Sequence, residues 1–283
     1  VNNPGIIIGR KGTIGTVYYS DQPFFCIDTA YYIEPDETKY KIKFLYYLLK
    51  TIGLKELNED SAVPGLNRDT AYAQEILLPP LPEQQSIAAI LSSFDDKIDL
   101  LHRQNKTLEA MAETLFRQWF MEEVDESWEI GKLGDAIELI YGKGLKEEIR
   151  TGTGFPVIGS NGIVGFHSEF LVEGPGIVIG RKGTLGRVVY LFENFYPIDT
   201  TYFVKSKLGS DGLFYEYFLL KTMNFEDMNT DSAVPGLNRE IALSVEIKIP
   251  PLQRLYDFNR FCILLFDKLK KNDGQTNLEV SVN

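Results

Sequence analysis

The most regular pattern of apolar and polar positions lies between Glu83 and Glu123. Apolar or small residues recur there in alternating steps of four and three, which is the heptad pattern of a coiled-coil helix. No Gly or Pro interrupts the stretch, and Pro82 directly precedes it, where a helix can begin. The seam consists of Ile87, Leu91, Phe94, Ile98, Leu101, Leu108, Ala112, Leu115 and Trp119, with Asn105 at its one polar position.

A helix of this length would extend roughly 60 Å at 1.5 Å per residue, too far to be enclosed by one domain of ordinary size. An apolar seam left in water is unstable, so it needs a second helix. The pattern therefore predicts a stiff spacer helix that packs against a partner helix.

Four motifs occur twice in the chain, always separated by the same 171 residues. They are Gly5–Gly15 with Gly176–Gly186, Ile27–Tyr31 with Ile198–Tyr202, Asp60–Arg68 with Asp231–Arg239, and Leu78–Leu81 with Ile249–Leu252. A constant offset predicts two duplicated domains in one register rather than scattered motifs.

The same offset predicts a second spacer helix. Adding 171 to the first four seam positions gives Phe258, Cys262, Leu265 and Leu269, which again step four, three and four. We expect this helix to stop early, at Asn272–Gly274, and residues 275–283 to form a frayed tail. The two helices are expected to pair antiparallel.

The duplication also shows what the first domain lacks. The second domain opens near Trp128, and residues 127–171 precede its copy of Val1, whereas the first domain has no counterpart of them. The first domain is therefore expected to be N-terminally incomplete, unless another chain completes it. The expected fold class is α+β, with two β-rich domains joined by long antiparallel helices. The first domain is expected at 1–82 and the long spacer helix at 83–124. The second domain is expected at 125–252, and the second, short spacer helix with its tail at 253–283.

Short patterns inside each domain predict the individual elements. A hairpin is expected from the β-branched and aromatic runs around the first Gly-rich turn. The predicted elements are a hairpin at Ile6–Ile8 and Thr16–Tyr19, strands at Cys26–Ile33 and Pro197–Val204, short helices at Phe44–Thr51 and Phe214–Thr222, and closing strands at Ala71–Leu78 and Ile241–Ile249.

The net charge of −11 at first argues against a nucleic-acid partner. However, residues 83–126 carry 4 basic and 10 acidic side chains, a local balance of −6, so the globular parts can still present basic patches. No apolar run reaches the ~20 residues that span a bilayer, so we expect a cytoplasmic protein without membrane contact. Cys26 and Cys262 lie in unrelated contexts, as reduced thiols do. Because the first residue is Val, a fragment or a processed product is expected.

The repeated Gly-rich loops are the first candidate site. Their glycine spacing fits neither a P-loop nor a dinucleotide fingerprint. A purely structural turn would explain the glycines, but not the two identical cationic tips. Arg and Lys at a loop tip suit phosphate contacts, and Arg can also read guanine. We therefore favour DNA contact by Arg10, Lys11, Thr13, Arg181, Lys182 and Thr184.

The repeated segment that ends in Asn-Arg has two interpretations. It is either a helix-to-strand connection, or a loop whose Asn67, Arg68, Asn238 and Arg239 face a DNA backbone or base edge. Ser160 and Asn161 form a further candidate turn. Arg187, where the first domain has Thr16, is a candidate for making the contacts of the second domain differ from those of the first.

Catalytic motifs are weak in this sequence. His102 and His167 are isolated, and no His/Cys cluster has metal-ligand spacing. Asp231, Glu246 and Lys248 loosely match a nuclease array, but the first-domain counterpart of Lys248 is Leu77. We interpret that match as coincidence and expect a chain without catalytic or metal-ligating residues.

The duplicated loops, the Asp60–Arg68 segments, the Leu78–Gln85 stretch that leads into the long helix and the Trp128–Asp135 opening together resemble the specificity subunits of Type I restriction–modification systems. The resemblance covers nearly the whole chain apart from the tail. It implies two target-recognition domains that each read half of a split site in double-stranded DNA. It also implies that methyltransferase (modification) subunits dock on the seam helices, that a restriction subunit joins them, and that S-adenosylmethionine, ATP and Mg act on those partner subunits, with no cofactor in this chain.

Other interpretations remain open at this stage. A related Type II system, with its methylase and nuclease fused, would use a similar specificity component. A truncated or silent cassette would act only as an assembly protein, and self-association through the coiled coil is a further expectation. An independent nuclease is disfavoured by the absence of catalytic motifs.

Overall fold

The computed structural model describes residues 1, 4–57, 64–209, 211–228 and 236–281. The chain divides into two compact units, which we call unit 1 (Val1–Leu101) and unit 2 (His102–Ser281). Among the described residues, no helix combines the length and apolar character needed to cross a membrane.

Unit 1 contains one antiparallel sheet with the strand order β2-β1-β3. Its strands are β1 (Gly5–Gly9), β2 (Val17–Ser20) and β3 (Ala30–Ile33). The predicted hairpin is confirmed, because Ile6 pairs with Tyr19 and Ile8 with Val17. The predicted strand at Cys26–Ile33 is shorter than expected and begins only at Ala30.

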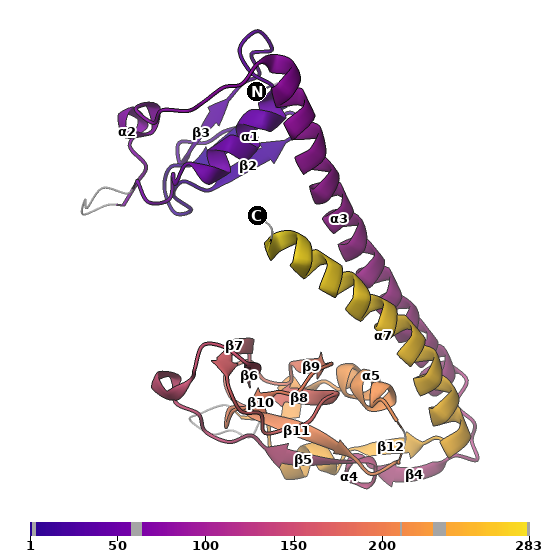
Figure 1. Cartoon of the computed structure of the whole chain (residues 1–283). Coiled ribbons are helices and arrows are strands. Elements are labelled where there is room, and N and C mark those ends of the chain that lie inside the picture. The colour runs from indigo at the N-terminus through magenta and orange to yellow at the C-terminus, as the bar shows by residue number, and fades with distance from the viewer. Residues whose placement is uncertain (2–3, 58–63, 210, 229–235, 282–283) are drawn as a thin grey trace. The chain divides into compact units, whose positions relative to one another are not determined.

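Helix α1 (Ile42–Thr51) confirms the first predicted short helix and lies against one face of this sheet (Figure 1). Its apolar stripe packs on Ile6 and Ile8 of β1. Both side chains are buried on the same face of the sheet, because alternate residues of a strand point to the same side. The unit 1 core consists of Ile6, Ile8, Val17, Leu45, Leu49, Leu54 and Leu66. A short helix, α2 (Arg68–Tyr72), follows.

Unit 2 repeats this arrangement and adds to it. Its main sheet has the order β5-β11-β8-β9, a second sheet has the order β10-β6-β7, and β12 pairs with β4. The strands are β4 (Glu129–Lys132), β5 (Ile137–Tyr141), β6 (Phe155–Gly159), β7 (Gly162–His167), β8 (Gly176–Gly180), β9 (Val188–Leu191), β10 (Tyr196–Pro197), β11 (Thr201–Ser206) and β12 (Glu246–Ile249).

The helices of unit 2 cover the main sheet and close its core. Those of the globular part are α4 (Leu133–Ala136), η2 (Glu147–Ile149), α5 (Phe214–Thr222), η3 (Phe225–Met228) and α6 (Arg239–Leu243). The second predicted short helix is therefore confirmed with the bounds expected. One large core joins α5 and the sheet to the long helices through aromatic rings in contact. The ring centroid of Phe116 lies within 6 Å of those of Phe120, Tyr215, Phe218 and Phe258.

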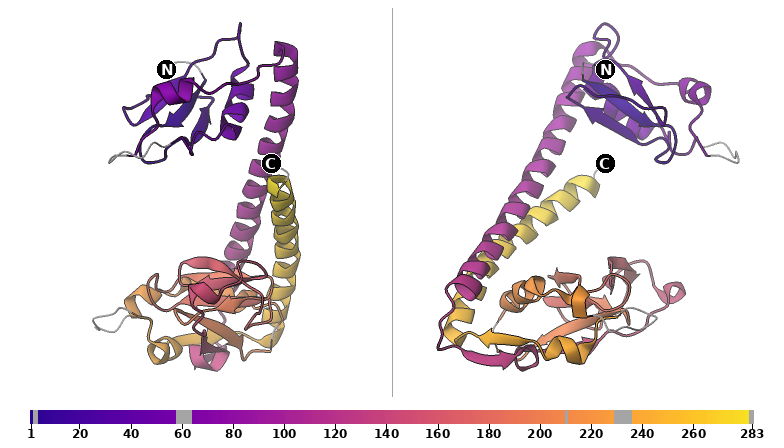
Figure 2. Two further views of the ribbon diagram at one scale, coloured as in Figure 1. Left: turned by 60° about the vertical axis from the view of Figure 1, so that its left-hand side comes forward. Right: turned by 180° about the vertical axis from the view of Figure 1, so that it is seen from behind.

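The predicted spacer helix is confirmed as α3 (Leu81–Arg117), a single helix of 37 residues. It begins one residue before Pro82, in the first turn, where proline is tolerated. A π-helical turn, η1 (Gln118–Glu122), continues it. Within unit 2, the C-terminal part of α3 lies beside α7 (Leu252–Ser281), as both views of Figure 2 show.

The predicted end of the second spacer helix was wrong. The second spacer helix does not stop at Asn272–Gly274, because α7 has 30 residues and ends at Ser281. A helical Gly costs only about 1 kcal/mol relative to Ala, and Asn272 is fully buried with hydrogen bonds to α3. Tertiary packing therefore overrides the local stop signal.

The predicted closing strand at Ala71–Leu78 does not form; α2 ends at Tyr72 and no strand follows it among the described residues of unit 1. In unit 2 the matching stretch contains α6 and then β12, which pairs with β4. β4 lies within residues 127–171, which have no counterpart between Val1 and Leu101, and no described strand pairs with the stretch after α2.

Candidate nucleic-acid interface

Three separate segments meet at the Gly-rich loop of unit 2. The backbone N–H groups of Arg181 and Lys182 donate to the carbonyl of Thr200, at 2.9 and 3.1 Å. The N–H of Leu237 donates to the carbonyl of Arg181 at 3.0 Å. These bonds join the β8–β9 loop to the turn before β11 and to the segment before α6. We call this arrangement the loop cluster of unit 2.

Unit 1 forms the same loop cluster at the same offset. The N–H groups of Arg10 and Lys11 donate to the carbonyl of Thr29, at 2.9 and 3.1 Å, and the N–H of Leu66 donates to the carbonyl of Arg10 at 2.9 Å. Since the duplicated motifs make duplicated hydrogen bonds, their recurrence reflects a shared backbone geometry.

The glycines of the loop serve this geometry. Gly12 and Gly183 have φ of +76° and +82°, a region that L side chains rarely adopt. A side chain at Gly9 or Gly180 would collide with the carbonyl oxygen of the Thr four residues later, at 1.9 and 2.1 Å. The structural-turn interpretation therefore accounts for the glycines and leaves the cationic tips to be explained.

The two loop arginines hold the cluster together. Arg10 donates from Nη1 to the carbonyl of Asp28 at 3.2 Å, and Arg181 donates from Nη1 to the carbonyl of Asp199 at 2.8 Å. Each guanidinium also lies over a tyrosine ring. In unit 1 the Cζ of Arg10 is 5.7 Å from the ring centroid of Tyr31. Both arginines are only partly exposed, so much of their bonding capacity is used within the protein.

Lys11 and Lys182 differ from the arginines beside them. Both are exposed at the loop tips, next to the exposed hydroxyls of Thr13 and Thr184. Across the described part of the chain, no carboxylate lies within ion-pair distance of either lysine. A flexible ammonium group of this kind suits an anionic partner such as a phosphate.

The Asn-Arg pairs begin short helices. Asn67 Oδ1 accepts hydrogen bonds from the N–H groups of Asp69 and Thr70, at 2.8 and 3.3 Å. Asn238 Oδ1 does the same for Glu240 and Ile241, at 3.0 and 3.1 Å. These are helix N-caps, so the segments lead into helices rather than out of them. Residues 60–63 and 231–235 of the duplicated motif, including Asp231, lie outside the described residues.

The arginines that follow stack on the same aromatic floor. Arg68 lies over Tyr31 at 5.2 Å, and Arg239 lies over Tyr141 at 5.4 Å, where it also pairs with Glu240 at 3.0 Å. Arg181 lies between Tyr141 and Tyr202, at 5.0 and 5.8 Å. Each cluster thus carries two neighbouring guanidinium groups over tyrosine rings, an arrangement that cation–π attraction stabilises.

The sequence predictions missed these tyrosines. Tyr31 and Tyr202 donate from their hydroxyls to the carbonyls of Leu66 and Leu237, at 3.1 and 3.2 Å. Burial, together with the neighbouring Tyr141, raises the pKa of Tyr202 to about 12, so the hydroxyl stays protonated and able to donate. Tyr31 and Tyr202 end the two copies of the repeated Ile27–Tyr31 motif, and this recurrence was the sequence signal that could have identified them.

Unit 2 adds a further turn to its cluster. Ser160 and Asn161 form the predicted turn, between β6 and β7. Arg187 donates from Nη1 to the backbone carbonyl and to Oδ1 of Asn161, at 2.7 and 3.0 Å. Three residues of the predicted site, Ser160, Asn161 and Arg187, therefore lie together beside the loop that carries Lys182.

Several predicted partner-binding positions pack inside the chain itself. Phe258 and Cys262 are fully buried in the unit 2 core, and Leu115, Trp119 and Leu265 pack against it. Leu101 is buried, whereas Phe94 is exposed; the other seam positions, Ile87, Leu91, Ile98, Leu108 and Leu269, are partly exposed. Apolar side chains that the seam pattern did not select are exposed on these helices, namely Ile90, Leu100, Met111 and Leu264.

Within the described ranges, no set of three or more His, Cys, Asp or Glu side chains is placed to hold a metal ion. The loop clusters instead combine ammonium, guanidinium, hydroxyl and backbone groups, which are the groups that contact phosphates and base edges.

Comparisons with known proteins give a consistent result. The family model described as Type I restriction modification DNA specificity domain matches residues 1–110 and 125–255. The MjaIX specificity subunit of a Type I restriction enzyme from Methanocaldococcus jannaschii is 35% identical over 121 residues, which cover 35% of this chain and 28% of the relative. The MjaVIII specificity subunit from the same organism is 30% identical over 156 residues, which cover 50% of this chain and 34% of the relative. The matched part therefore spans about a third of each relative.

A solved structure shares the fold. The S subunit of a Type I restriction–modification system from M. genitalium superimposes with a TM-score of 0.64 at 21% identity, covering 99% of this chain and 80% of that one.

Proposed function

The chain belongs to the Type I restriction modification DNA specificity family, and we propose that it is a DNA-reading specificity subunit whose two loop clusters contact the two halves of a split target. One observation carries this proposal: the same backbone hydrogen bonds present the same Lys and Thr at the loop tips of both units. Two equivalent cationic sites in one chain suit a polyanion with a repeating backbone, such as double-stranded DNA.

The proposal divides the work among the residues of each cluster. Lys11 and Lys182 contact phosphates, because their charges are exposed and outside any ion pair of the described chain. The loop arginines position the loop, since they bond to backbone carbonyls and stack on tyrosine. Arg187 and Asn161, which only unit 2 combines, contribute to reading its own half-site.

The long helices make the two weak contacts act as one. α3 runs across the boundary between unit 1 and unit 2, and we propose that it acts as a stiff spacer. A stiff connection raises the effective concentration of the second site once the first has bound. We propose that its length, roughly 55 Å for 37 residues at 1.5 Å each, sets the unread gap between the half-sites.

Catalysis is assigned to partner subunits. We propose that methyltransferase and restriction subunits assemble on this chain and act in the cytoplasm, where the host DNA lies. The exposed apolar side chains Ile90, Leu100, Met111 and Leu264 on the long helices support such docking, because apolar side chains on a helix surface favour protein contacts.

The test compares single substitutions of the loop tips in the assembled complex. Lys182→Ala and Lys11→Ala should each lower affinity for a target duplex, and each should reduce the slope of log K against log salt by about 1. Lys39→Ala removes the same charge from an exposed position outside the loops and should leave both quantities unchanged. A double change, Arg181→Ala with Lys182→Ala, should weaken binding further.

Footprinting of the same complex gives the second measurement. Two protected patches with an accessible gap between them are expected, and each lysine variant should weaken one patch more than the other. Unchanged affinity and salt slope in both lysine variants would contradict the loop role. If the complex assembles but gives no footprint, the chain would instead act only as an assembly protein.

A further inference from the structure

Exposed apolar side chains gather on the outer strand of the second sheet of unit 2. β7 is an edge strand in the order β10-β6-β7. Its residues Ile163, Val164 and Phe166 have exposed fractions of 60%, 39% and 41%. We call these three side chains the β7 patch. Apolar side chains gathered on one exposed strand mark a surface that meets a partner.

A bulge accounts for two adjacent exposed residues in β7. The pairing of β6 with β7 shifts between Val157 and Ile158, and Val164 is the extra residue in β7. Successive residues of a regular strand point to opposite faces, whereas a bulge turns one of them. Val164 lies against Gly159, where a Cβ would be 3.0 Å from Val164 Cγ1. Ile163 and Val164 are therefore both exposed although they are neighbours in sequence.

Two backbone carbonyls of β7 are bonded outside the sheet. Arg150 donates from Nη1 to the carbonyl of Val164 at 2.7 Å, and the N–H of Gly152 donates to the carbonyl of Phe166 at 3.1 Å. A strand added from another protein would need such carbonyls for its own hydrogen bonds. The β7 patch therefore offers side chains rather than a backbone edge, which disfavours an added strand as its partner.

Cationic groups of the unit 2 loop cluster lie at one end of the β7 patch. Arg187 bonds to Asn161, in the turn that leads into β7. Ser160 Oγ, in the same turn, lies 3.1 Å from the position of a Cβ at Gly183, which follows the exposed Lys182. An apolar surface beside positive charges suits a partner that is anionic and carries apolar groups. DNA combines both, because its backbone is anionic and each thymine presents a C5-methyl group in the major groove.

We propose that the β7 patch is a specificity surface that contacts the C5-methyl groups of thymine in the half-site read by unit 2. The proposal rests on the proposed DNA contact of the loop cluster and adds the base that is read. A two-stranded ribbon such as β6–β7 fits the major groove, where these methyl groups are exposed. Loss of one buried methyl group corresponds to a loss of about fourfold in affinity.

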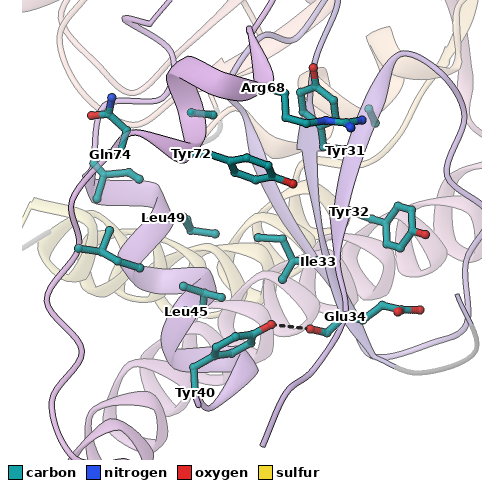
Figure 3. A pocket seen from close by; sticks show the side chains of 14 residues that line it. Tyr31, Tyr32, Ile33, Glu34, Tyr40, Leu45, Leu49, Arg68, Tyr72 and Gln74 are labelled. Carbon is teal, nitrogen blue, oxygen red and sulfur yellow. Dashed lines mark hydrogen bonds between the residues drawn. The ribbon is translucent and has the colours of Figure 1, made fainter. Parts of the chain in front are cut away.

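Unit 1 places different side chains beside its own loop cluster. Arg68 of that cluster lies over Tyr31, and Tyr32 and Tyr72 are exposed near it (Figure 3). Tyrosine hydroxyls donate and accept hydrogen bonds, whereas the β7 patch offers apolar contact alone. The half-site read by unit 1 therefore provides an internal comparison for any effect of thymine methyl groups.

The test uses the assembled complex and a duplex that it selects from a random pool. The half-site read by unit 2 is the one whose footprint weakens in Lys182→Ala. The probe is the same duplex with deoxyuridine in place of every thymidine of that half-site, which removes the methyl groups and keeps the hydrogen bonds of the base pairs. The affinity of the unaltered complex is expected to fall about fourfold for each contacted methyl group.

Substitutions locate the contact on β7. Ile163→Ala should lower affinity for the thymidine duplex and reduce the further loss caused by deoxyuridine, and Phe166→Ala tests the other end of the patch in the same way. Ile163→Val keeps a branched side chain and should retain most of the response. Ile130→Ala is the matched control, because Ile130 on β4 is 68% exposed and lies outside the patch; it should keep the full response. Deoxyuridine in the half-site read by unit 1 should affect all of these proteins equally.

The outcomes separate this proposal from the proposed function. An unchanged midpoint of urea unfolding shows that each variant is folded. A selected half-site without a T·A pair, equal affinity for the two duplexes, or an unchanged response in both Ile163→Ala and Phe166→Ala would overturn the methyl contact and leave the DNA contact standing. Failure of the folded Ile163→Ala chain to assemble with its partners would identify the β7 patch as a protein contact and would also overturn the proposal. Absence of any footprint would contradict the proposed function, and this proposal with it.

Discussion

Asn272 donates a hydrogen bond from Nδ2 to Oδ1 of Asn105 at 2.8 Å, and so joins α7 to α3 at the one polar position of the predicted seam. Asn105 in turn donates from Nδ2 to Oδ1 of Asp273 at 2.6 Å. A polar pair within an apolar helix seam costs stability but fixes which residues face each other, since a shifted register would leave amides buried without partners. We infer that this pair sets the register of α7 on α3.

The asparagine pair gives the first prediction. Asn272→Leu should lower the free energy of unfolding of unit 2 by about 1–2 kcal/mol, because Asn105 loses a buried partner. The double variant Asn105→Leu with Asn272→Leu should recover much of that loss, because two apolar side chains can pack together. Urea unfolding followed by tryptophan fluorescence measures this, since both tryptophans of the chain, Trp119 and Trp128, lie in unit 2. Additive losses in the double variant would show that the two amides are not coupled.

The loop arginine of unit 2, Arg181, gives the second prediction. Arg181→Lys should destabilise unit 2 by roughly 1 kcal/mol, because an ammonium group cannot keep both the bond to Asp199 and the contact with the Tyr141 ring. Lys182→Ala is the matched control, because its side chain is exposed at the loop tip, and should change stability by less than about 0.5 kcal/mol. Thermal unfolding of the two variants separates the structural role of Arg181 from the contact role of Lys182. Equal stabilities would contradict this division.

The aromatic core at the end of α3 gives the third. Phe116 is 1% exposed and contacts four aromatic rings, so Phe116→Ala should cost about 3–5 kcal/mol of unit 2 stability. Met111→Ala on the same helix, where the side chain is 48% exposed, should cost far less. Denaturant unfolding compares the two variants through their midpoints, provided that the dependence of the unfolding free energy on denaturant concentration is the same in both. A small loss for Phe116→Ala would mean that α3 is not anchored by these rings.

The buried thiol gives the fourth. Burial raises the pKa of Cys262 to about 12 from a usual value of 9.0, so the folded state holds a proton that the unfolded state releases above about pH 9. Unit 2 stability is therefore fully present below pH 9 and falls as pH rises from 9 toward 12. Burial also raises the pKa of Tyr190, Tyr215 and Tyr217, which adds to the same alkaline loss.

Cys262→Ala separates the thiol from the tyrosines. The variant should start less stable at pH 8, because it leaves a cavity, but its stability should fall less steeply between pH 9 and 12, by up to about 1.4 kcal/mol per pH unit. Urea unfolding at several pH values measures both slopes. Identical slopes would mean that Cys262 ionises equally well in the folded state.

The candidate site was foreseen in part. The loop lysines and arginines could be chosen as candidates from the repeated Arg-Lys pair, although the bonds of Arg10 and Arg181 to backbone carbonyls give the arginines a structural role as well. The tyrosine floor and the N-cap role of Asn67 could not, because both depend on which distant segments meet. Asn67 satisfies α2, and Arg10 reaches the carbonyl of Asp28, only after the chain has folded back on itself.

The sequence by itself determined the duplication, the long helix α3 and the hairpins, since these follow from periodicity and from motifs repeated at one spacing. Only the tertiary structure decided where strands end and how far α7 runs. The stretch at Glu75–Leu78 has the composition of a strand but lacks a neighbour to pair with, while Glu246–Ile249 finds β4 and becomes one. A strand needs a partner for its hydrogen bonds, and a helix can pass through Gly274 once buried contacts such as those of Asn272 hold it.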